Sequence, residues 1–306
     1  MTIISSVVAT TLSHRLICAL TAVFLATAYV LSLYAIPSRV RALPRDDPVH
    51  ILWRIAAVAT VTVLSPLVVF FLAPQGSPPL FNLFGAAQPC LSPYGGLSPL
   101  ALVGVLFAGP LVAAAARAGA GAGSAFAGAS ISSSKATILA LSSPTLTTLR
   151  ALVVAPVSEE VVFRAAALPL IIAAGASHAG ATAASAMLFA AAHAHHYFEH
   201  VTQGMSPRSA ARTVGMQISF TGIFALLAAH SFLRSGSLLG VVAAHALANA
   251  MGLPDCSFWT TKHHPAHWAR YLVAAAYITG ILGFVWLLAM DKWPRGECAL
   301  SPSPYT

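Results

Sequence analysis

Charged residues are scarce in this sequence of 306 residues. Asp, Glu, Lys and Arg make up 8% of the chain, whereas hydrophobic residues make up 58%. A typical soluble domain carries about 25% charged residues, so a soluble fold of this size would have too little polar surface to stay dissolved. The scarcity argues against a soluble protein and favours an integral membrane protein.

Cysteine is also sparse, and the basic residues are not clustered. Cys18, Cys90, Cys256 and Cys298 are scattered without a CxxC pair, so they predict neither a zinc site nor a disulfide framework. Lys and Arg outnumber Asp and Glu by 16 to 8. They form no compact patch with interleaved aromatic residues, which argues against nucleic-acid binding.

Long apolar runs are abundant. A membrane span needs about 20 mostly apolar residues, and the runs predict one transmembrane domain over residues 1–306, an all-α polytopic membrane protein. We expect about eight transmembrane helices enclosing an intramembrane catalytic cavity. The runs lie at 16–36, 51–73, 97–116, 148–175, 178–198, 211–233, 237–253 and 267–289. No convincing cleavage pattern follows the first run, so we expect a retained helix.

The basic residues predict the orientation of these spans. When the first loop is taken as cytosolic and the chain alternates, most Lys and Arg fall on the cytosolic side, as the positive-inside rule requires. The other side receives only Arg15, Arg234, Lys292 and Arg295. Both chain ends are then expected on the non-cytosolic side.

The run at 148–175 contains two adjacent carboxylates and an arginine. Ionisable groups at membrane depth are kept where they pair or face a wet cavity. Glu160 and Arg164 stand four residues apart, so on a helix they share a face and can form an ion pair. Glu159 would then lie on a different face, free to act. The alternative is that both glutamates only neutralise Arg164 and hold helices together.

The runs at 178–198 and 237–253 each carry polar residues at helical spacing. His193 lies one turn after Phe189, whose ring can pack beside it, and an imidazole can exchange a proton near neutral pH. His245 and Asn249 also stand four apart, and both can donate hydrogen bonds to an oxyanion. The alternatives are interfacial histidines, which would suit His195 and His196 better, and polar contacts between helices.

The alternating topology brings these groups towards one face of the membrane. Glu159, His193, His245 and Asn249 all fall on the cytosolic side, which indicates a single site. Glu159 and His193 could deprotonate a water that attacks a peptide carbonyl, with His245 and Asn249 stabilising the oxyanion. Zinc held by the histidines and a glutamate is the other possibility, although HExxH is absent. A catalytic Cys256 is disfavoured because it follows the run without a nearby base.

The three motifs resemble those of a known superfamily. Glu159-Glu160-x-x-x-Arg164, Phe189-x-x-x-His193 and His245-x-x-x-Asn249 are similar, in order and spacing, to the CAAX protease and bacteriocin-processing superfamily. The flanking segments 155–165, 193–196, 232–236 and 251–254 resemble the eukaryotic type II CAAX prenyl proteases, the Ras-converting CAAX endopeptidases. The resemblance covers residues 149–254, which we expect to form the catalytic core.

This resemblance implies a multi-pass protease of the endoplasmic reticulum membrane with its site towards the cytosol. Such an enzyme removes the last three residues of prenylated CAAX proteins such as small GTPases, which it meets in the lipid bilayer. It implies no metal and no cofactor. Glu159 and His193 would activate water, His245 and Asn249 would form the oxyanion hole, and Glu160, Arg164 and Phe189 would support them.

Three other functions are compatible with the residues. A protease of the same superfamily could act on non-prenylated peptides. A proton-coupled transporter could use Glu159, Glu160 and His193 as a relay, although no internal repeat supports it. An inactive scaffold could bind prenylated tails, but the complete set of four polar groups argues against it.

Overall fold

The computed structural model describes residues 2–72, 96–119, 145–252 and 267–289, and every regular element within them is helical. This confirms the all-α class. In chain order the α-helices are α1 (Thr2–Ser32), α2 (Ser38–Arg41), α3 (Pro48–Leu72), α6 (Ser98–Leu106), α7 (Ala108–Gly119), α9 (Leu146–Leu149), α10 (Ala155–Glu160), α11 (Leu168–Ala173), α12 (His178–Ala192), α13 (His196–Thr202), α14 (Pro207–Ser235), α15 (Leu238–Met251) and α16 (His267–Ala289). Cys90, Cys256 and Cys298 lie outside the described residues, so the structure does not bear on a catalytic Cys256.

Within the described residues, four helical segments are long and apolar enough to cross a membrane: Leu12–Ser32, Pro48–Leu72, Pro207–Ser235 and Arg270–Leu287. The helix α6 and the first part of α7 make a fifth candidate, bent by 72°. These segments correspond to five of the eight predicted runs. The run at 148–175 is helical as far as Ala173 but alternates between α- and π-helix, and the main helices of the runs at 178–198 and 237–253 have 15 and 14 residues. Four or five spans are therefore supported within the described residues, and a count of eight is not established.

The run at 148–175 changes between α-helix and π-helix near its prolines. Two π-helical segments, Arg150–Val154 and Val161–Ala167, end just before Pro156 and Pro169. Proline has no amide N–H and clashes with the carbonyl four residues earlier, so the preceding turns widen into π-helix, a distortion that is frequent at functional sites. The same stretch carries Glu159, Glu160 and Arg164. It therefore differs from an ordinary apolar span in both geometry and charge.

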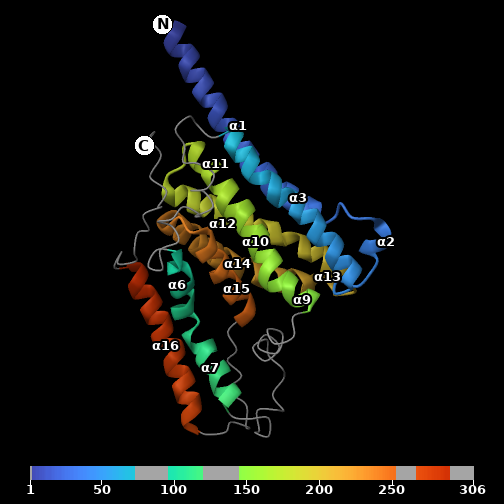
Figure 1. The fold of residues 1–306 in the computed structure, drawn as a ribbon, viewed down its shortest axis with the longest axis vertical. Helices are drawn as coiled ribbons and strands as arrows, with labels where there is room; N and C mark the ends of the chain where they lie inside the picture. The colour runs from blue at the N-terminus through green and yellow to red at the C-terminus, as the bar shows by residue number, and fades with distance from the viewer. Residues whose placement is uncertain (1, 73–95, 120–144, 253–266, 290–306) are drawn as a thin grey trace.

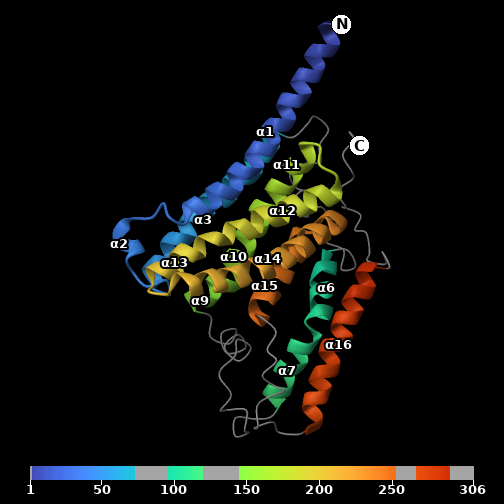
Figure 2. The same ribbon diagram turned by 180° about the vertical axis from the view of Figure 1, so that it is seen from behind.

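The helices pack in two adjoining groups (Figures 1 and 2). In the first, α1 and α3 lie side by side and contact the second π-helical segment, while α12 packs along α14. In the second, α16 packs against α6 and α7. Helix α15 joins the groups because it contacts both α6 and α10. Three of the largest fully buried side chains are Arg164 and Phe163 of the second π-helical segment and Phe189 of α12, and these two elements are in contact.

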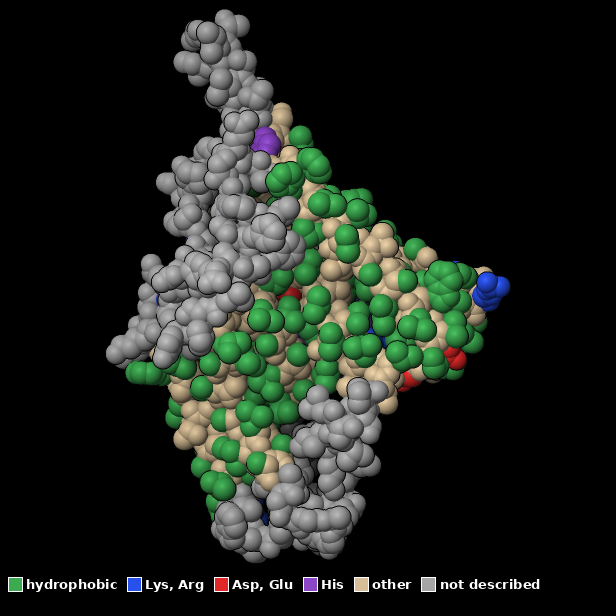
Figure 3. Space-filling view, viewed as in Figure 1, with side chains coloured by type: hydrophobic (Ala, Val, Ile, Leu, Met, Phe, Trp, Pro, Cys, Tyr) green, Lys and Arg blue, Asp and Glu red, His purple; other side chains and the backbone are tan. Residues whose placement is uncertain are grey.

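The outer surface of the helices is apolar. Large hydrophobic side chains of α1, α3, α14 and α16 are exposed, among them Phe24, Phe71, Ile223 and Leu282. Figure 3 shows hydrophobic side chains over most of the visible described surface, with the most prominent acidic and basic groups at the end near α2. Water would disfavour so large an apolar surface, whereas lipid tails would cover it. The structure is thus consistent with a multi-pass membrane protein.

A tight corner between α14 and α15 sets the position of the His245 helix. Gly236 ends α14 with φ +64°, a left-handed conformation that favours glycine. Ser237 then caps α15: its hydroxyl accepts a hydrogen bond from the Gly240 amide at 3.0 Å and donates one to the Gly96 carbonyl at 2.7 Å. The corner fixes where α15 begins, and hence which residues of α15 face α10.

Candidate active site

Glu160 and Arg164 form a fully buried ion pair. The Arg164 Nε lies 3.1 Å from the Glu160 Oε2, and both side chains are 0% exposed. The pairing predicted from their i, i+4 spacing is therefore confirmed. The Arg164 guanidinium also lies over the Phe189 ring, 4.4 Å from its centroid, a favourable cation–π geometry. Because Glu160 is committed to this pair, only Glu159 is left to face open space.

Glu160 also holds His245, which arrives from α15. The His245 Nδ1 lies 2.7 Å from the Glu160 Oε1, and because a carboxylate only accepts, Nδ1–H donates. The other ring nitrogen, Nε2, then points towards Glu159, 3.8 Å from its Oε2. That separation is too long for a hydrogen bond. The buried Glu160 carboxylate therefore orients both the Arg164 guanidinium and the His245 ring. The His245 ring in turn lies beside the Glu159 carboxylate.

Phe189 lies at the centre of these groups. Its ring centroid is 4.9 Å from that of His193 and 6.0 Å from that of His245. The predicted packing of Phe189 beside His193 is confirmed, and its contact with His245 is an additional finding. The Phe189 side chain is 1% exposed. It therefore contacts both imidazoles and the Arg164 guanidinium, which is itself 0% exposed.

His193 has a defined tautomer. It begins the 3-10 turn His193–His195 that follows α12, and its Nδ1 lies 2.8 Å from the Phe189 carbonyl oxygen. A carbonyl can only accept, so Nδ1 carries the hydrogen and the Nε2 of a neutral ring has a free lone pair. Nε2 is therefore the nitrogen that can take a proton.

Asn249, like His245, contacts the helical run that carries the two glutamates. Its side-chain amide donates to the Ala151 carbonyl at 3.0 Å, and the residue is exposed. Both residues of the His245-x-x-x-Asn249 motif thus contact the stretch from Ala151 to Glu160, in agreement with a shared face of α15. A primary amide carries two N–H donors, so one donor of Asn249 is still free.

A cavity of about 230 Å³ joins three of the four predicted groups. Glu159, His193 and Asn249 line it, and its apolar wall includes Leu33, Val58 and Phe189. His245 is buried and is not part of the lining. It reaches the site through its contacts with the two glutamates. The arrangement places two proton acceptors, Glu159 and the His193 Nε2, on one open space.

Several residues that shape the cavity were not predicted from the sequence. The Tyr29 hydroxyl, from α1, lies 2.9 Å from the Ser158 Oγ. Because Ser158 donates to the Ala155 carbonyl, Tyr29 is the donor to Ser158. Arg45, Arg54 and Arg150 also line the cavity. No spacing rule predicts that residues near the start of the chain, such as Tyr29 and Arg54, lie beside Glu159 and His193. The basic-residue pattern had assigned Arg45, Arg54 and Arg150 to the cytosolic side.

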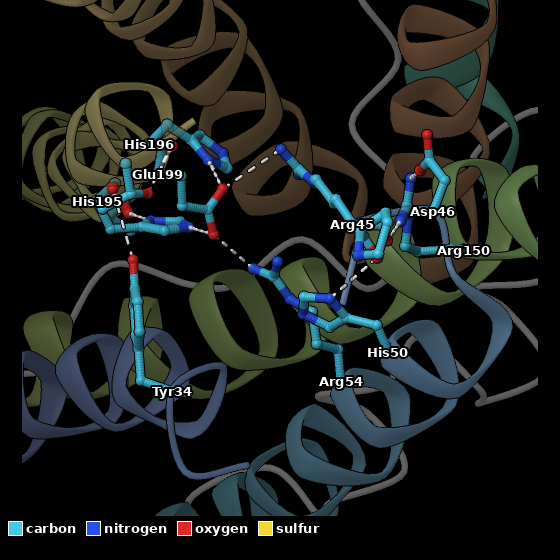
Figure 4. A network of polar contacts seen from close by, with 12 residues as sticks. Tyr34, Arg45, Asp46, His50, Arg54, Arg150, His195, His196 and Glu199 are labelled. Atoms are coloured by element: carbon cyan, nitrogen blue, oxygen red, sulfur yellow. Dashed lines mark hydrogen bonds and ion pairs between the residues drawn. The ribbon is translucent and has the colours of Figure 1, made fainter. Parts of the chain in front are cut away.

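One further cluster surrounds Glu199 (Figure 4). Its carboxylate oxygens lie 3.0 Å from Arg54, 3.4 Å from Arg45 and 2.9 Å from the His196 Nδ1. Burial raises the pKa of Glu199, but the hydrogen bond from His196 and the charges of Arg54 and Arg45 outweigh burial and hold the pKa well below its ordinary value. Glu199 is therefore a permanent anion that joins α13 to α3.

The Glu199 cluster is also the one place in the described ranges where three metal-binding side chains meet. Potential ligand atoms of His195, His196 and Glu199 lie within 4.8 Å of one another. A metal cation there would have to displace Arg54 and Arg45 from the carboxylate or lie beside them. Like charges at this distance repel, so the cluster is built for guanidinium groups and does not fit a metal ion.

Comparison with known proteins assigns the chain to a family. The family model described as "Type II CAAX prenyl endopeptidase Rce1-like" matches residues 141–251. CAAX prenyl protease 2 of Homo sapiens is 32% identical over 269 residues, covering 86% of this chain and 78% of the human protein. The protein of the same name from Arabidopsis thaliana is 31% identical over 281 residues, covering 88% and 87%. No solved structure gives a significant match.

The matched region contains all three polar motifs, and the alignments to the relatives extend well beyond it into the N-terminal helices. The chain belongs to the family of CAAX prenyl protease 2, the type II CAAX prenyl endopeptidases.

Proposed function

We infer that the chain is an endopeptidase that removes the C-terminal tripeptide from prenylated CAAX proteins. The observation that supports the mechanism is the shared cavity, in which Glu159, His193 and Asn249 meet while His245 borders Glu159. Glu159 and the His193 Nε2 are both hydrogen-bond acceptors. A water molecule between them would donate one hydrogen to each, so that its lone pair faces the substrate carbonyl.

The reaction then follows general base catalysis. Glu159 takes a proton from the water as its oxygen attacks the carbonyl carbon of the prenylated cysteine, forming a tetrahedral oxyanion. Collapse of this intermediate breaks the C–N bond, and the proton passes from Glu159 to the leaving amine. The products are a prenylated cysteine with a free carboxylate and the released tripeptide.

His245 and Asn249 are the proposed oxyanion donors. Asn249 offers the N–H that Ala151 does not use. His245 already donates from Nδ1 to Glu160, so it can donate from Nε2 only as an imidazolium. When the oxyanion forms, Glu159 has taken the proton of the water, so such a cation and Arg164 would face the negative charges of Glu160 and of the oxyanion.

The metal-free route is preferred on the geometry of the glutamates. Both oxygens of Glu160 are committed, one to His245 and one to Arg164. Within the described residues, only the Glu199 cluster brings three ligand atoms within 4.8 Å of one another, and Glu159, His193 and His245 do not form such a group. This leaves general base catalysis by the side chains themselves.

We also propose the finer membrane arrangement expected from the sequence. About eight spans would enclose the cavity as one transmembrane domain, with residues 149–254 as its catalytic core. The continuous helical run Leu146–Ala173, at about 1.5 Å per residue, is long enough to cross the roughly 30 Å hydrocarbon core. The arginines on the cavity wall support a cytosolic opening by the positive-inside rule, here in the endoplasmic reticulum membrane, where prenylated substrates such as small GTPases would be met.

The central test measures tripeptide release from a farnesylated CAAX peptide by the purified protein. The wild-type protein is compared with Glu159→Gln, with an unprenylated peptide and with 1,10-phenanthroline. We expect release that requires Glu159 and the prenyl group and survives the chelator. Full activity of Glu159→Gln would refute the mechanism, and loss with the chelator would favour zinc. Equal cleavage of the unprenylated peptide would favour a protease of wider substrate range.

A further inference from the structure

Three arginines lie on the wall of the same cavity as Glu159 and His193. Arg45 belongs to the α2–α3 loop, Arg54 to α3 and Arg150 to the first π-helical segment. Their side chains are 43%, 12% and 22% exposed. Glu199 and Asp46, the carboxylates that pair with them, are not part of the cavity lining. Figure 4 shows this arrangement, in which the guanidinium groups come from one side and Glu199 from the other.

The three arginines outnumber the carboxylates that pair with them. Their ion pairs are with Glu199 and Asp46, and the Asp46 side chain is 69% exposed, so solvent weakens its pairing with Arg150. Glu159 lines the same cavity, but its ion-pair contact is with His245 and not with these arginines. Burial lowers the pKa of Arg45; Glu199 opposes this effect, and the positive charges of Arg54 and Arg150 add to it. An excess of positive charge in a partly dehydrated wall is a site for an anion.

The arginines still have donors for such an anion. Arg54 uses Nη2 for Glu199, and Arg45 uses Nη1. A guanidinium carries five N–H groups in a planar fork that matches the two oxygens of a carboxylate. The contacts to Glu199 therefore orient Arg54 and Arg45 without exhausting them. Glu199 is a positioning residue in this arrangement.

We propose that Arg54 and Arg150, with Arg45 beside them, bind the terminal carboxylate of the substrate peptide and so select cleavage three residues from the chain end. This inference rests on the proposed function, since it assigns the carboxylate of the tripeptide to the cationic wall and the scissile bond to Glu159 and His193. Three extended residues span roughly 10 Å. A fixed anion site and a fixed water site within one cavity would act as a ruler of that length.

The test compares two farnesylated peptides of identical sequence, one with a free C-terminal carboxylate and one with a C-terminal amide. Cleavage is measured as kcat/KM with the wild-type protein in a neutral detergent. Binding is measured separately with the Glu159→Gln variant, because a binding measurement does not require turnover. Charge-assisted hydrogen bonds of this kind typically give about tenfold to a hundredfold preference for the acid.

Arg150→Gln is the main variant, because its partner Asp46 is mostly exposed and its loss leaves no buried charge behind. Arg54→Gln is the second variant, and its folding is checked by its Tm in detergent. Arg39→Gln is the matched control, since Arg39 is exposed and lies outside the cavity lining. We expect the ratio of kcat/KM for the acid to that for the amide to fall towards one in Arg150→Gln and in Arg54→Gln, whatever their absolute rates, and to stay at the wild-type value in the control.

Equal cleavage and binding of acid and amide by the wild type would overturn the inference while leaving the endopeptidase function intact. An acid preference that survives both arginine variants would also overturn it. If neither peptide is cleaved, the proposed function fails, but an arginine-dependent preference in binding would still support the carboxylate site. Equal binding in that case would reject both.

Discussion

The buried pair between Glu160 and Arg164 offers a sharp test of which glutamate is structural. Both side chains are 0% exposed, and Glu160 also accepts from His245 at 2.7 Å. Glu160→Gln removes the negative charge but keeps an oxygen that can still accept from His245. The main cost is then the unpaired Arg164 cation. Removing one partner of a buried pair typically costs about 3–5 kcal/mol.

This cost should be visible as a lower apparent Tm. At roughly 2–4 °C per kcal/mol for a chain of this size, Glu160→Gln should melt about 10 °C below the wild type. Glu159→Gln should melt within about 2 °C of the wild type, because the Glu159 carboxylate lies 3.8 Å from its nearest ion-pair partner and faces the cavity. The double variant Glu160→Gln/Arg164→Met removes both charges and should recover most of the loss.

The assay is thermal unfolding in detergent, followed by intrinsic tryptophan fluorescence at one fixed heating rate, since membrane proteins often unfold irreversibly. Tripeptide release is measured on the same samples. Glu159→Gln should be stable and inactive, whereas Glu160→Gln should be unstable. A Glu160→Gln protein as stable as the wild type, or a double variant no more stable than Glu160→Gln, would refute the assignment of Glu160 as the counter-ion of Arg164.

Three further outcomes are expected. Asn249→Ala should lower kcat by about a hundredfold, the usual cost of one oxyanion donor, with an unchanged Tm; a normal kcat would remove Asn249 from the oxyanion hole. Glu199→Gln should be less stable than the wild type by roughly 1–3 kcal/mol, measured as Tm against pH. Because folding depresses the pKa of Glu199, its stabilisation is complete above the ordinary value of about 4.3 and is lost only as the pH falls from there through the depressed pKa. A difference that changed between about pH 6 and 8 would contradict this cause. Gly240→Leu should fail to fold, because a side chain there would collide with the Gly96 carbonyl and Pro99; a normal yield and Tm would show that α6 and α15 can separate at this point.

The sequence alone determined the class of the protein and the contacts within single helices. Low charge and long apolar runs indicated a membrane protein, and the part of the chain that the structure describes has four or five helices suited to a span. The pairs Glu160–Arg164 and Phe189–His193 could be predicted because a helix brings residues four apart onto one face. Each family motif also spans only five or six consecutive residues. The family could therefore be recognised without knowledge of how the helices pack.

Only the tertiary structure decided which helices meet. His245 pairs with Glu160 across 85 residues of sequence, Tyr29 with Ser158 across 129, and Arg54 with Glu199 across 145. No local periodicity encodes such contacts, because they depend on how whole helices pack. The same holds for the cavity. The sequence could place Glu159 on a free face of its helix, but Tyr29 of α1, Arg54 of α3 and His196 of α13 come to its wall only through helix packing.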